Sequence, residues 1–120
     1  MIIYRIENPD TENGMWYDGQ GRYRPFIKTL TDGRSADLPM EWDARYGKGG
    51  RRWYSGCKDS SMMNVWFSAQ DARELVDAGY RLFEFWASEF VVEEFQVIFT
   101  REGITSRREI PLSALWPELN

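Results

Sequence analysis

The chain has 120 residues, 42% of them hydrophobic and 16% aromatic, and a formal net charge of −4 at pH 7. This length gives room for one domain with an adequate core, and the composition is too apolar for a disordered chain. The sequence contains no histidine. That absence excludes histidine general bases, Ser-His-Asp catalysis and the usual zinc sites, so we predict no metal site.

Cysteine use and hydropathy indicate the compartment. Cys57 is the single cysteine, so no internal disulfide can form and a reducing compartment is expected. No apolar run approaches the roughly 18 residues that a membrane helix needs, and no signal-peptide pattern opens the chain. We therefore expect a cytoplasmic protein without a membrane contact. Lys58 is placed to lower the thiol pKa of Cys57, but without a histidine partner we do not predict catalysis there.

The first six residues are predicted to form a short buried strand that contains one charged side chain, Arg5. Two interpretations of Arg5 stay open. In the first, the aliphatic part of the side chain packs in the core and the guanidinium group reaches a carboxylate or solvent. In the second, the guanidinium group binds a ligand phosphate or a partner carboxylate through two parallel hydrogen bonds.

Turn signals follow at residues 8–10 and 13–14, and residues 15–26 have the pattern of a hairpin with aromatic residues on each arm. Residues 30–52 lack clear periodicity, and loops of this length in compact domains are often functional.

A basic stretch closes that loop. Residues 45–54 interleave four cations, three glycines and three aromatic side chains. Glycines let backbone amides approach a phosphate, cations supply charge, and an aromatic ring can stack on a base. The stretch matches neither the Walker pattern nor the dinucleotide-fold fingerprint, and its alternative is a loop solvated by its own charges. The candidate anion- or nucleotide-binding residues are Lys48, Arg51, Arg52, Trp53 and Tyr54.

The stretch from residue 53 to residue 99 is predicted to organise the fold. Asp59 or Ser60 caps a first short helical segment that extends to residue 67. Ser68 and Asp71 have the spacing of a capping box, which predicts a helix over 69–78.

Gly79 is expected to end that helix in a left-handed conformation. Strands are predicted at 80–86 and 95–100, and Glu102-Gly103 is predicted to turn the second into a hairpin with residues 104–110. Residues 110–116 have the pattern of a terminal helical turn. Together these elements predict a single globular α+β domain over 1–120, with a small twisted, mainly antiparallel sheet and two or three short helices packed on it.

Negative charge gathers in the second half. Residues 1–60 hold ten basic and nine acidic side chains, whereas residues 61–120 hold five and ten, and no cation occurs over 82–100. Such a chain is a poor nucleic-acid binder. The segment supplies a predicted acidic ridge that either binds a basic partner or is an ordinary solvated edge. Its candidate partner-binding residues are Glu84, Trp86, Glu89, Phe90, Glu93 and Glu94.

Several of these residues together resemble small accessory proteins of bacteriophages. The matching segments are Tyr4-Arg5-Ile6-Glu7-Asn8-Pro9-Asp10-Thr11 with Gly14, Trp66-Phe67, Leu75, Gly79-Tyr80 and Gln96-Val97-Ile98-Phe99. The resemblance implies a phage- or prophage-encoded protein that acts in the cytoplasm of the host bacterial cell. It further implies an inhibitor of a host defence protein, anti-CRISPR proteins included, that needs no cofactor and binds a partner with a basic surface. It makes no prediction of oligomeric state.

The order of elements also looks distantly like the ADP-ribosyltransferase fold. That resemblance implies an arginine on an early strand, a serine on a central strand and a glutamate on a later one, which here correspond to Arg5, Ser55 and Glu94, with NAD as the cofactor. The chain departs from the family pattern, because it has no Ser-Thr-Ser and Glu94-Phe-Gln96 reverses the usual Gln-x-Glu. Capture of a nucleotide signal by the basic stretch is the third interpretation.

Overall fold

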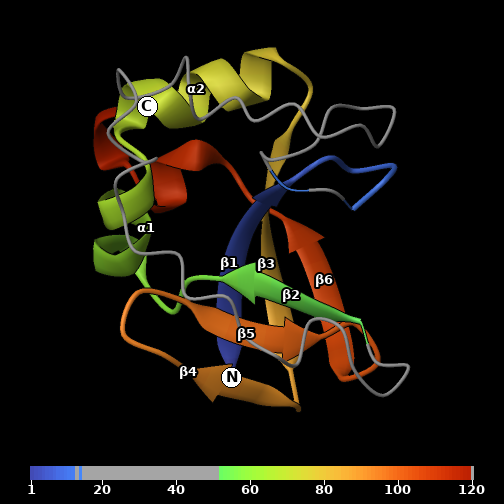
Figure 1. Cartoon of the computed structure of the whole chain (residues 1–120). Helices are drawn as coiled ribbons and strands as arrows, with labels where there is room; N and C mark the ends of the chain where they lie inside the picture. Colours follow the sequence, from blue (N-terminus) through green and yellow to red (C-terminus); the bar gives the residue numbers. More distant parts are fainter. Residues whose placement is uncertain (13, 15–51, 120) are drawn as a thin grey trace.

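The computed structural model describes residues 1–12, 14 and 52–119 (Figure 1). The hairpin predicted at 15–26 and almost all of the loop predicted at 30–52 therefore lie outside the described residues. The described elements are six strands and two α-helices, followed by two short 3-10 turns. In chain order they are β1 (Ile2–Glu7), β2 (Trp53–Gly56), α1 (Ser60–Trp66), α2 (Ala69–Asp77), β3 (Arg81–Ala87), β4 (Phe90–Val92), β5 (Val97–Thr100), β6 (Ile104–Glu109), η4 (Leu112–Ala114) and η5 (Pro117–Leu119).

The strands form two small antiparallel sheets, one in the order β1-β3-β6 and the other in the order β2-β5-β4. The two meet where β2 ends beside β1. There the amide of Tyr4 donates to the carbonyl of Cys57, and the amide of Cys57 donates to the carbonyl of Tyr4, both at 2.8 Å. The predicted α+β class with antiparallel pairing is confirmed, with the strands divided between two sheets that this bridge joins.

Gly56 makes that junction possible. A Cβ atom on Gly56 would lie 2.5 Å from Cγ2 of Ile3 and 2.9 Å from the carbonyl oxygen of Tyr4. Any larger side chain would therefore push β2 away from β1, because a packed interior cannot absorb an overlap of this size without moving backbone.

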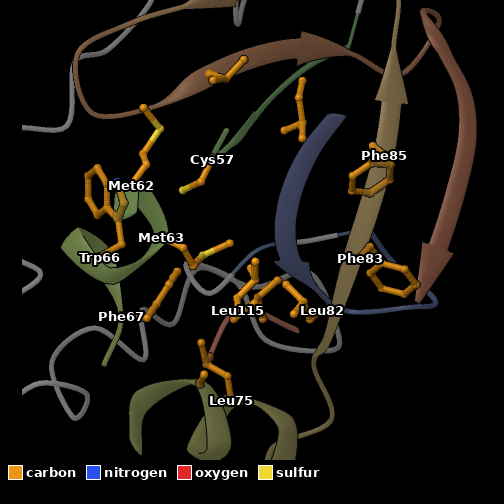
Figure 2. Close-up of a cluster of buried hydrophobic side chains, with 14 of the residues drawn as sticks. Cys57, Met62, Met63, Trp66, Phe67, Leu75, Leu82, Phe83, Phe85 and Leu115 are labelled. Atoms are coloured by element: carbon orange, nitrogen blue, oxygen red, sulfur yellow. The ribbon is translucent and has the colours of Figure 1, made fainter. Parts of the chain in front are cut away.

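Aromatic and aliphatic side chains from both sheets and both helices fill the core. Phe85 of β3 and Phe99 of β5 are fully buried, and their ring centroids lie 5.3 Å apart, so each sheet contributes one ring to the contact. Figure 2 shows Met62 and Met63 of α1 and Leu75 of α2 directed toward the strands. At the end of the described chain Trp116 is 1% exposed, which confirms that the predicted terminal turn docks on the core.

The helix ends follow the predicted capping chemistry. The side chain of Asp59 accepts from the amide of Met62 at 2.8 Å, which fixes the start of α1. At the start of α2, the Ser68 hydroxyl accepts from the amide of Asp71 at 3.1 Å, and the Asp71 carboxylate accepts from the amide of Ser68 at 2.8 Å. Gly79 follows α2 with a φ of +101°. Both the capping box and the left-handed end of the helix are confirmed.

The hairpin predicted around Glu102-Gly103 is wrong. The turn forms, since the amide of Ile104 donates to the carbonyl of Arg101 at 3.2 Å, but the strands on its two sides do not pair with each other. β5 pairs with β2 and β4, whereas β6 pairs with β3. Because both edges of β5 are already occupied, the chain after the turn crosses to the free edge of the other sheet. β4 itself was not predicted, because its three residues are too few to give a periodic signal.

Candidate functional site

Large apolar side chains are exposed at the end of β3 and along β4. Among the described residues, the exposed large hydrophobic side chains are Trp86 (48%), Phe90 (40%), Val92 (48%) and Val65 (36%). Three of these four fall within the seven residues from 86 to 92. Exposed aromatic residues of this kind are the side chains that dominate protein–protein binding energy. We call Trp86, Glu89, Phe90, Val92, Glu93 and Glu94 the β3–β4 surface.

The register of β4 explains why its apolar side chains are exposed. Phe90 is paired with Phe99 and Val92 with Val97, and both partners on β5 are fully buried. Side chains that are directly opposite each other in an antiparallel pair lie on the same face of the sheet. Phe90 and Val92 therefore continue the core-facing side of the sheet, but they belong to an edge strand, and so about half of each side chain remains exposed.

Carboxylates flank β4 at both ends. Oε1 of Glu89 accepts from the hydroxyl of Thr100 at 2.7 Å, and Oε1 of Glu93 accepts from Nε2 of Gln96 at 2.7 Å. Glu94 is exposed in the turn between β4 and β5. Glu89 and Glu93 are thus half-buried and bonded within the sheet, whereas the carboxylate of Glu94 is exposed.

Glu84, the fourth member of the predicted acidic ridge, belongs to the other sheet. It lies on β3 and is paired with Arg108 on β6, whose Nη2 donates to Oε1 of Glu84 at 3.0 Å. Only 16% of the Glu84 side chain is exposed. Glu84 is thus paired with an arginine of its own sheet. Of the predicted acidic ridge, only Glu89, Glu93 and Glu94 lie next to β4.

A second cluster of charges is buried around Glu7, the last residue of β1. The carboxylate of Glu7 is fully buried and accepts from three arginines on separate parts of the chain. Nε of Arg5 donates to it at 2.8 Å, Nη2 of Arg107 donates at 2.9 Å, and Nη2 of Arg101 donates to the same oxygen as Arg5. One carboxylate therefore connects β1, β6 and the turn after β5.

Aromatic rings provide the surroundings of these arginines. The Arg101 guanidinium lies over the ring of Tyr54 at 4.3 Å and over Phe85 at 4.9 Å, and that of Arg107 lies over Phe83 at 3.9 Å. Nε of Arg101 is also 3.1 Å from a carboxylate oxygen of Glu12. Cations that are stacked on aromatic faces and paired with carboxylates can stay charged in a core.

The turn after β1 is fixed onto the same cluster. Oδ1 of Asn8 accepts from the amides of Asp10 and Thr11 at 2.9 and 3.1 Å, and Glu12 has a positive φ of 65°. This conformation directs the Glu12 carbonyl to Nη2 of Arg5, which donates to it at 3.1 Å. Burial lowers the pKa of the Arg5 guanidinium below its ordinary value, while the charge of Glu7 acts in the opposite direction.

Two of the three residues matched to the transferase pattern lie together. Nη1 of Arg5 donates to the carbonyl of Ser55 at 2.7 Å, and the Ser55 hydroxyl donates to Oε1 of Gln96 at 2.7 Å. Gln96 in turn bonds Glu93, so a hydrogen-bonded chain extends from Ser55 to Glu93. Glu94 is outside this chain of bonds and its side chain is exposed.

A scan against protein families matches residues 1–113 to the bacteriophage T4 Y00F protein family. The chain belongs to this family. The match covers the Glu7 cluster, the Ser55–Gln96–Glu93 chain and the whole β3–β4 surface, and it confirms the bacteriophage origin that the resemblance in the sequence implied. No curated protein was found that matches the chain. No solved structure was found that matches it either.

The basic stretch of this Y00F-family chain is described only from Arg52 onward, and Lys48 and Arg51 lie outside the described residues. Glu102 accepts both from the amide of Arg52 at 2.9 Å and from its Nε at 3.1 Å. These bonds lower the pKa of Glu102 and raise that of Arg52. Trp53 and Tyr54 are half-buried on β2, and the ring of Tyr54 lies against the guanidiniums of Arg101 and Arg5.

The described part of the Y00F-family chain holds no group of three or more Cys, Asp or Glu side chains placed to bind a metal ion. Its helices are all too short or too polar to span a bilayer. Burial raises the pKa of the Cys57 thiol from 9.0 to about 12, so the nucleophilic thiolate does not form near neutral pH.

Sequence reasoning missed the Glu7 cluster and Val92. Glu7 was assigned neither to the strand predicted over the first six residues nor to the turn predicted at 8–10, yet the spacing Arg5-Ile6-Glu7 places both charges on one face of a strand. Two opposite charges on the buried face of a strand indicate an internal ion pair, and this signal could have identified the cluster. Val92 was missed together with the strand that exposes it.

Proposed function

We propose that this bacteriophage protein binds and inhibits a host defence protein with a basic contact surface, in the manner of an anti-CRISPR protein, through the β3–β4 surface. The observation that supports this proposal is the exposure of Trp86, Phe90 and Val92 within one short segment. Single exposed apolar residues are normal in proteins, whereas exposed apolar side chains on one side of a strand, as Phe90 and Val92 are, with charges at both ends of the strand, are typical of a binding surface.

The composition of the surface supports a protein rather than a nucleic acid as the partner. Glu89, Glu93 and Glu94 would meet the phosphates of a nucleic acid with like charge, and residues 82–100 contain no cation. Against a basic protein the same carboxylates form a rim that accelerates the encounter, while Trp86 and Phe90 supply most of the affinity.

The test is capture of a partner from bacterial lysate by the tagged protein, with mass spectrometry of what is bound. Trp86→Ala and Phe90→Ala should each weaken capture of that partner at least about tenfold, because truncating a central aromatic hot spot typically costs about 2 kcal/mol or more. Val65→Ala is the matched control, since Val65 is exposed to a similar extent but lies on α1.

The captured protein is then tested for inhibition. In a reconstituted assay of its defence activity, the wild-type chain and Val65→Ala should inhibit, and Trp86→Ala should not. Capture that is unchanged by Trp86→Ala and Phe90→Ala, or a partner whose activity the wild-type chain does not alter, would reject the proposal.

A second candidate function is NAD-dependent ADP-ribosyl transfer, which the contact between Arg5 and Ser55 favours. The hydrogen-bonded chain places Gln96 next to the Ser55 hydroxyl and Glu93 next to Gln96, so it ends on the carboxylate of Glu93, one residue before the predicted Glu94. The check is incubation of lysate with labelled NAD and the purified chain. Under this function Glu93→Gln or Glu94→Gln removes protein labelling, and absence of labelling by the wild-type chain rejects it.

A further inference from the structure

The backbone of β4 has one edge that no described strand occupies. β4 is the last strand of the order β2-β5-β4. The amide of Glu93 donates to the carbonyl of Gln96 at 2.8 Å, and the amide of Thr100 donates to the carbonyl of Glu89 at 3.3 Å. In an antiparallel ladder such bonded pairs alternate with unbonded ones. Glu89 and Glu93 therefore direct their backbone groups toward β5, as does Val91, which lies between them.

It follows that Phe90 and Val92 direct their backbone groups the other way. They form the unbonded pairs with Phe99 and Val97, so their N–H and C=O groups face the open edge of the sheet. The two residues with exposed apolar side chains are thus also the two with outward-facing backbone donors and acceptors. Natural edge strands are protected by short length, charges, proline or bulges. β4 contains no proline, bulge or charged residue, so its protection is limited to its length of three residues and to Glu89 and Glu93 at its ends.

Side chains alternate between the two faces of this edge. Phe90 and Val92 lie on the core-facing side, and Glu89, Val91 and Glu93 occupy the alternate positions. A strand placed against β4 would therefore meet apolar side chains on one face and mainly carboxylates on the other. The complementary strand alternates apolar and basic residues.

We propose that β4 accepts an extended segment of the partner protein as an added β-strand, with apolar residues beside Phe90 and Val92 and basic residues beside Glu89 and Glu93. This inference rests on the proposed protein-binding function and specifies the segment of the partner that is bound. Backbone hydrogen bonds to an exposed sheet edge would provide affinity, and the alternating side chains would provide specificity.

A second copy of the chain fits this edge poorly. In the symmetric antiparallel register that pairs Phe90 of each copy with Val92 of the other, the centre lies at Val91 and Glu89 of each copy is placed opposite Glu93 of the other. Like charges directly opposite each other in a sheet are destabilising. The charges at both ends of β4 thus favour a basic segment of another protein.

The experiment measures amide hydrogen exchange of the full chain by NMR with two probe peptides, one of alternating valine and lysine and one of alternating valine and glutamate. The valine–lysine peptide should slow exchange of the Phe90 and Val92 amides at least about tenfold, because those amides become hydrogen-bonded. The valine–glutamate peptide should leave their exchange unchanged. The proposal is overturned if the valine–lysine peptide protects neither amide, or if both are already protected in a dimer of the free chain.

Val92→Pro provides a second readout in the lysate capture. Proline removes the outward N–H of residue 92 without taking a hydrogen bond from the β4–β5 ladder, and edge strands tolerate it. Val92→Thr keeps both the N–H and the branched shape, and is the matched control. Capture of the partner should fall at least about tenfold with proline and change little with threonine.

The outcomes separate this inference from the function on which it rests. If Trp86→Ala abolishes capture and Val92→Pro does not, the surface binds the partner by side chains alone and strand addition is overturned. If no partner is captured while the valine–lysine peptide protects both amides, the edge accepts a strand and the inhibitor function fails. If Val92→Pro does not fold, the exchange measurement on the wild-type chain decides.

Discussion

Arg101 donates to Glu7 across 94 positions of the sequence, and this contact joins the turn after β5 to the end of β1. Glu7 is fully buried, and 5% of the Arg101 side chain is exposed. β1 and β5 belong to different sheets, so this ion pair is a polar link between the two sheets in addition to the aromatic contact of Phe85 with Phe99. Removing its carboxylate takes from the buried Arg5 the carboxylate it is paired with and leaves Arg101 with Glu12 alone.

We therefore expect Glu7→Gln to destabilise the fold by about 3–5 kcal/mol, the usual effect of removing one partner from a buried ion pair. The measurement is urea unfolding followed by tryptophan fluorescence. Glu84→Gln is the matched control, because Glu84 pairs with an Arg108 side chain that is 67% exposed, and such surface pairs contribute about 0.2–1 kcal/mol. Equal losses in the two variants would contradict a special role for Glu7.

Cys57 should make the free energy of unfolding depend on pH in the alkaline range. Burial raises the thiol pKa in the folded state from 9.0 to about 12, so the folded chain holds this proton where the unfolded chain has lost it. The stabilisation is complete below pH 9.0 and is lost progressively as pH rises toward the folded value.

The measurement for Cys57 compares unfolding of the wild-type chain and Cys57→Ala as pH is raised. Other groups titrate in both proteins, so the difference between the two free energies isolates the thiol. It should shrink as pH rises above 9.0. A constant difference, or rapid labelling of Cys57 by a thiol reagent in the native protein near neutral pH, would contradict the prediction.

Gly56→Ala tests the junction of the two sheets. The added Cβ would overlap Cγ2 of Ile3, which is 2.5 Å away, and overpacking of a core typically costs about 1–3 kcal/mol. A double-mutant cycle with Ile3→Ala separates this overlap from a change in backbone preference. The double variant should be more stable than the sum of the two single losses predicts, because Ile3→Ala removes the atom that the added Cβ would meet. If the two losses of stability simply add, the overlap with Ile3 is not the cause of the loss in Gly56→Ala.

Features of the fold that depend on residues close in sequence were predictable, whereas features that depend on residues far apart in sequence were not. The start of α2 was predictable because Ser68 and Asp71 bond each other within one turn, and the end of the helix was predictable from Gly79 alone. The assignment of β6 to β3 depends instead on which sheet edges are already occupied, and no local pattern around Glu102-Gly103 carries that information. For the same reason Arg101 gave no signal, since its partners Glu7 and Tyr54 are far from it in sequence.

The candidate site follows the same division. Trp86, Phe90 and the glutamates around them were predicted as a surface because charge and aromatic content are properties of a short segment. The separation of Glu84 from the other glutamates was not predictable, because Glu84 is bonded to Arg108 through the pairing of β3 with β6. The transferase pattern gave only the order of Arg5, Ser55 and Glu94 along the chain, whereas the contacts of Ser55 with Arg5 and Gln96 depend on the pairing of β2 with its neighbours.

Glu94 provides the last prediction, which concerns the rate of partner binding. Its side chain is exposed beside β4, so Glu94→Lys changes the charge of the rim without removing an apolar contact. Charges at the rim of an interface act mainly on the association rate, and their effect is screened by salt. We expect Glu94→Lys to slow association with the captured partner several-fold at low salt and to leave dissociation nearly unchanged. Glu118→Lys changes net charge equally at the exposed C-terminal turn, and should have a much smaller effect. Biolayer interferometry at low and high salt measures both rates, and equal effects of the two variants would show that net charge alone governs the encounter.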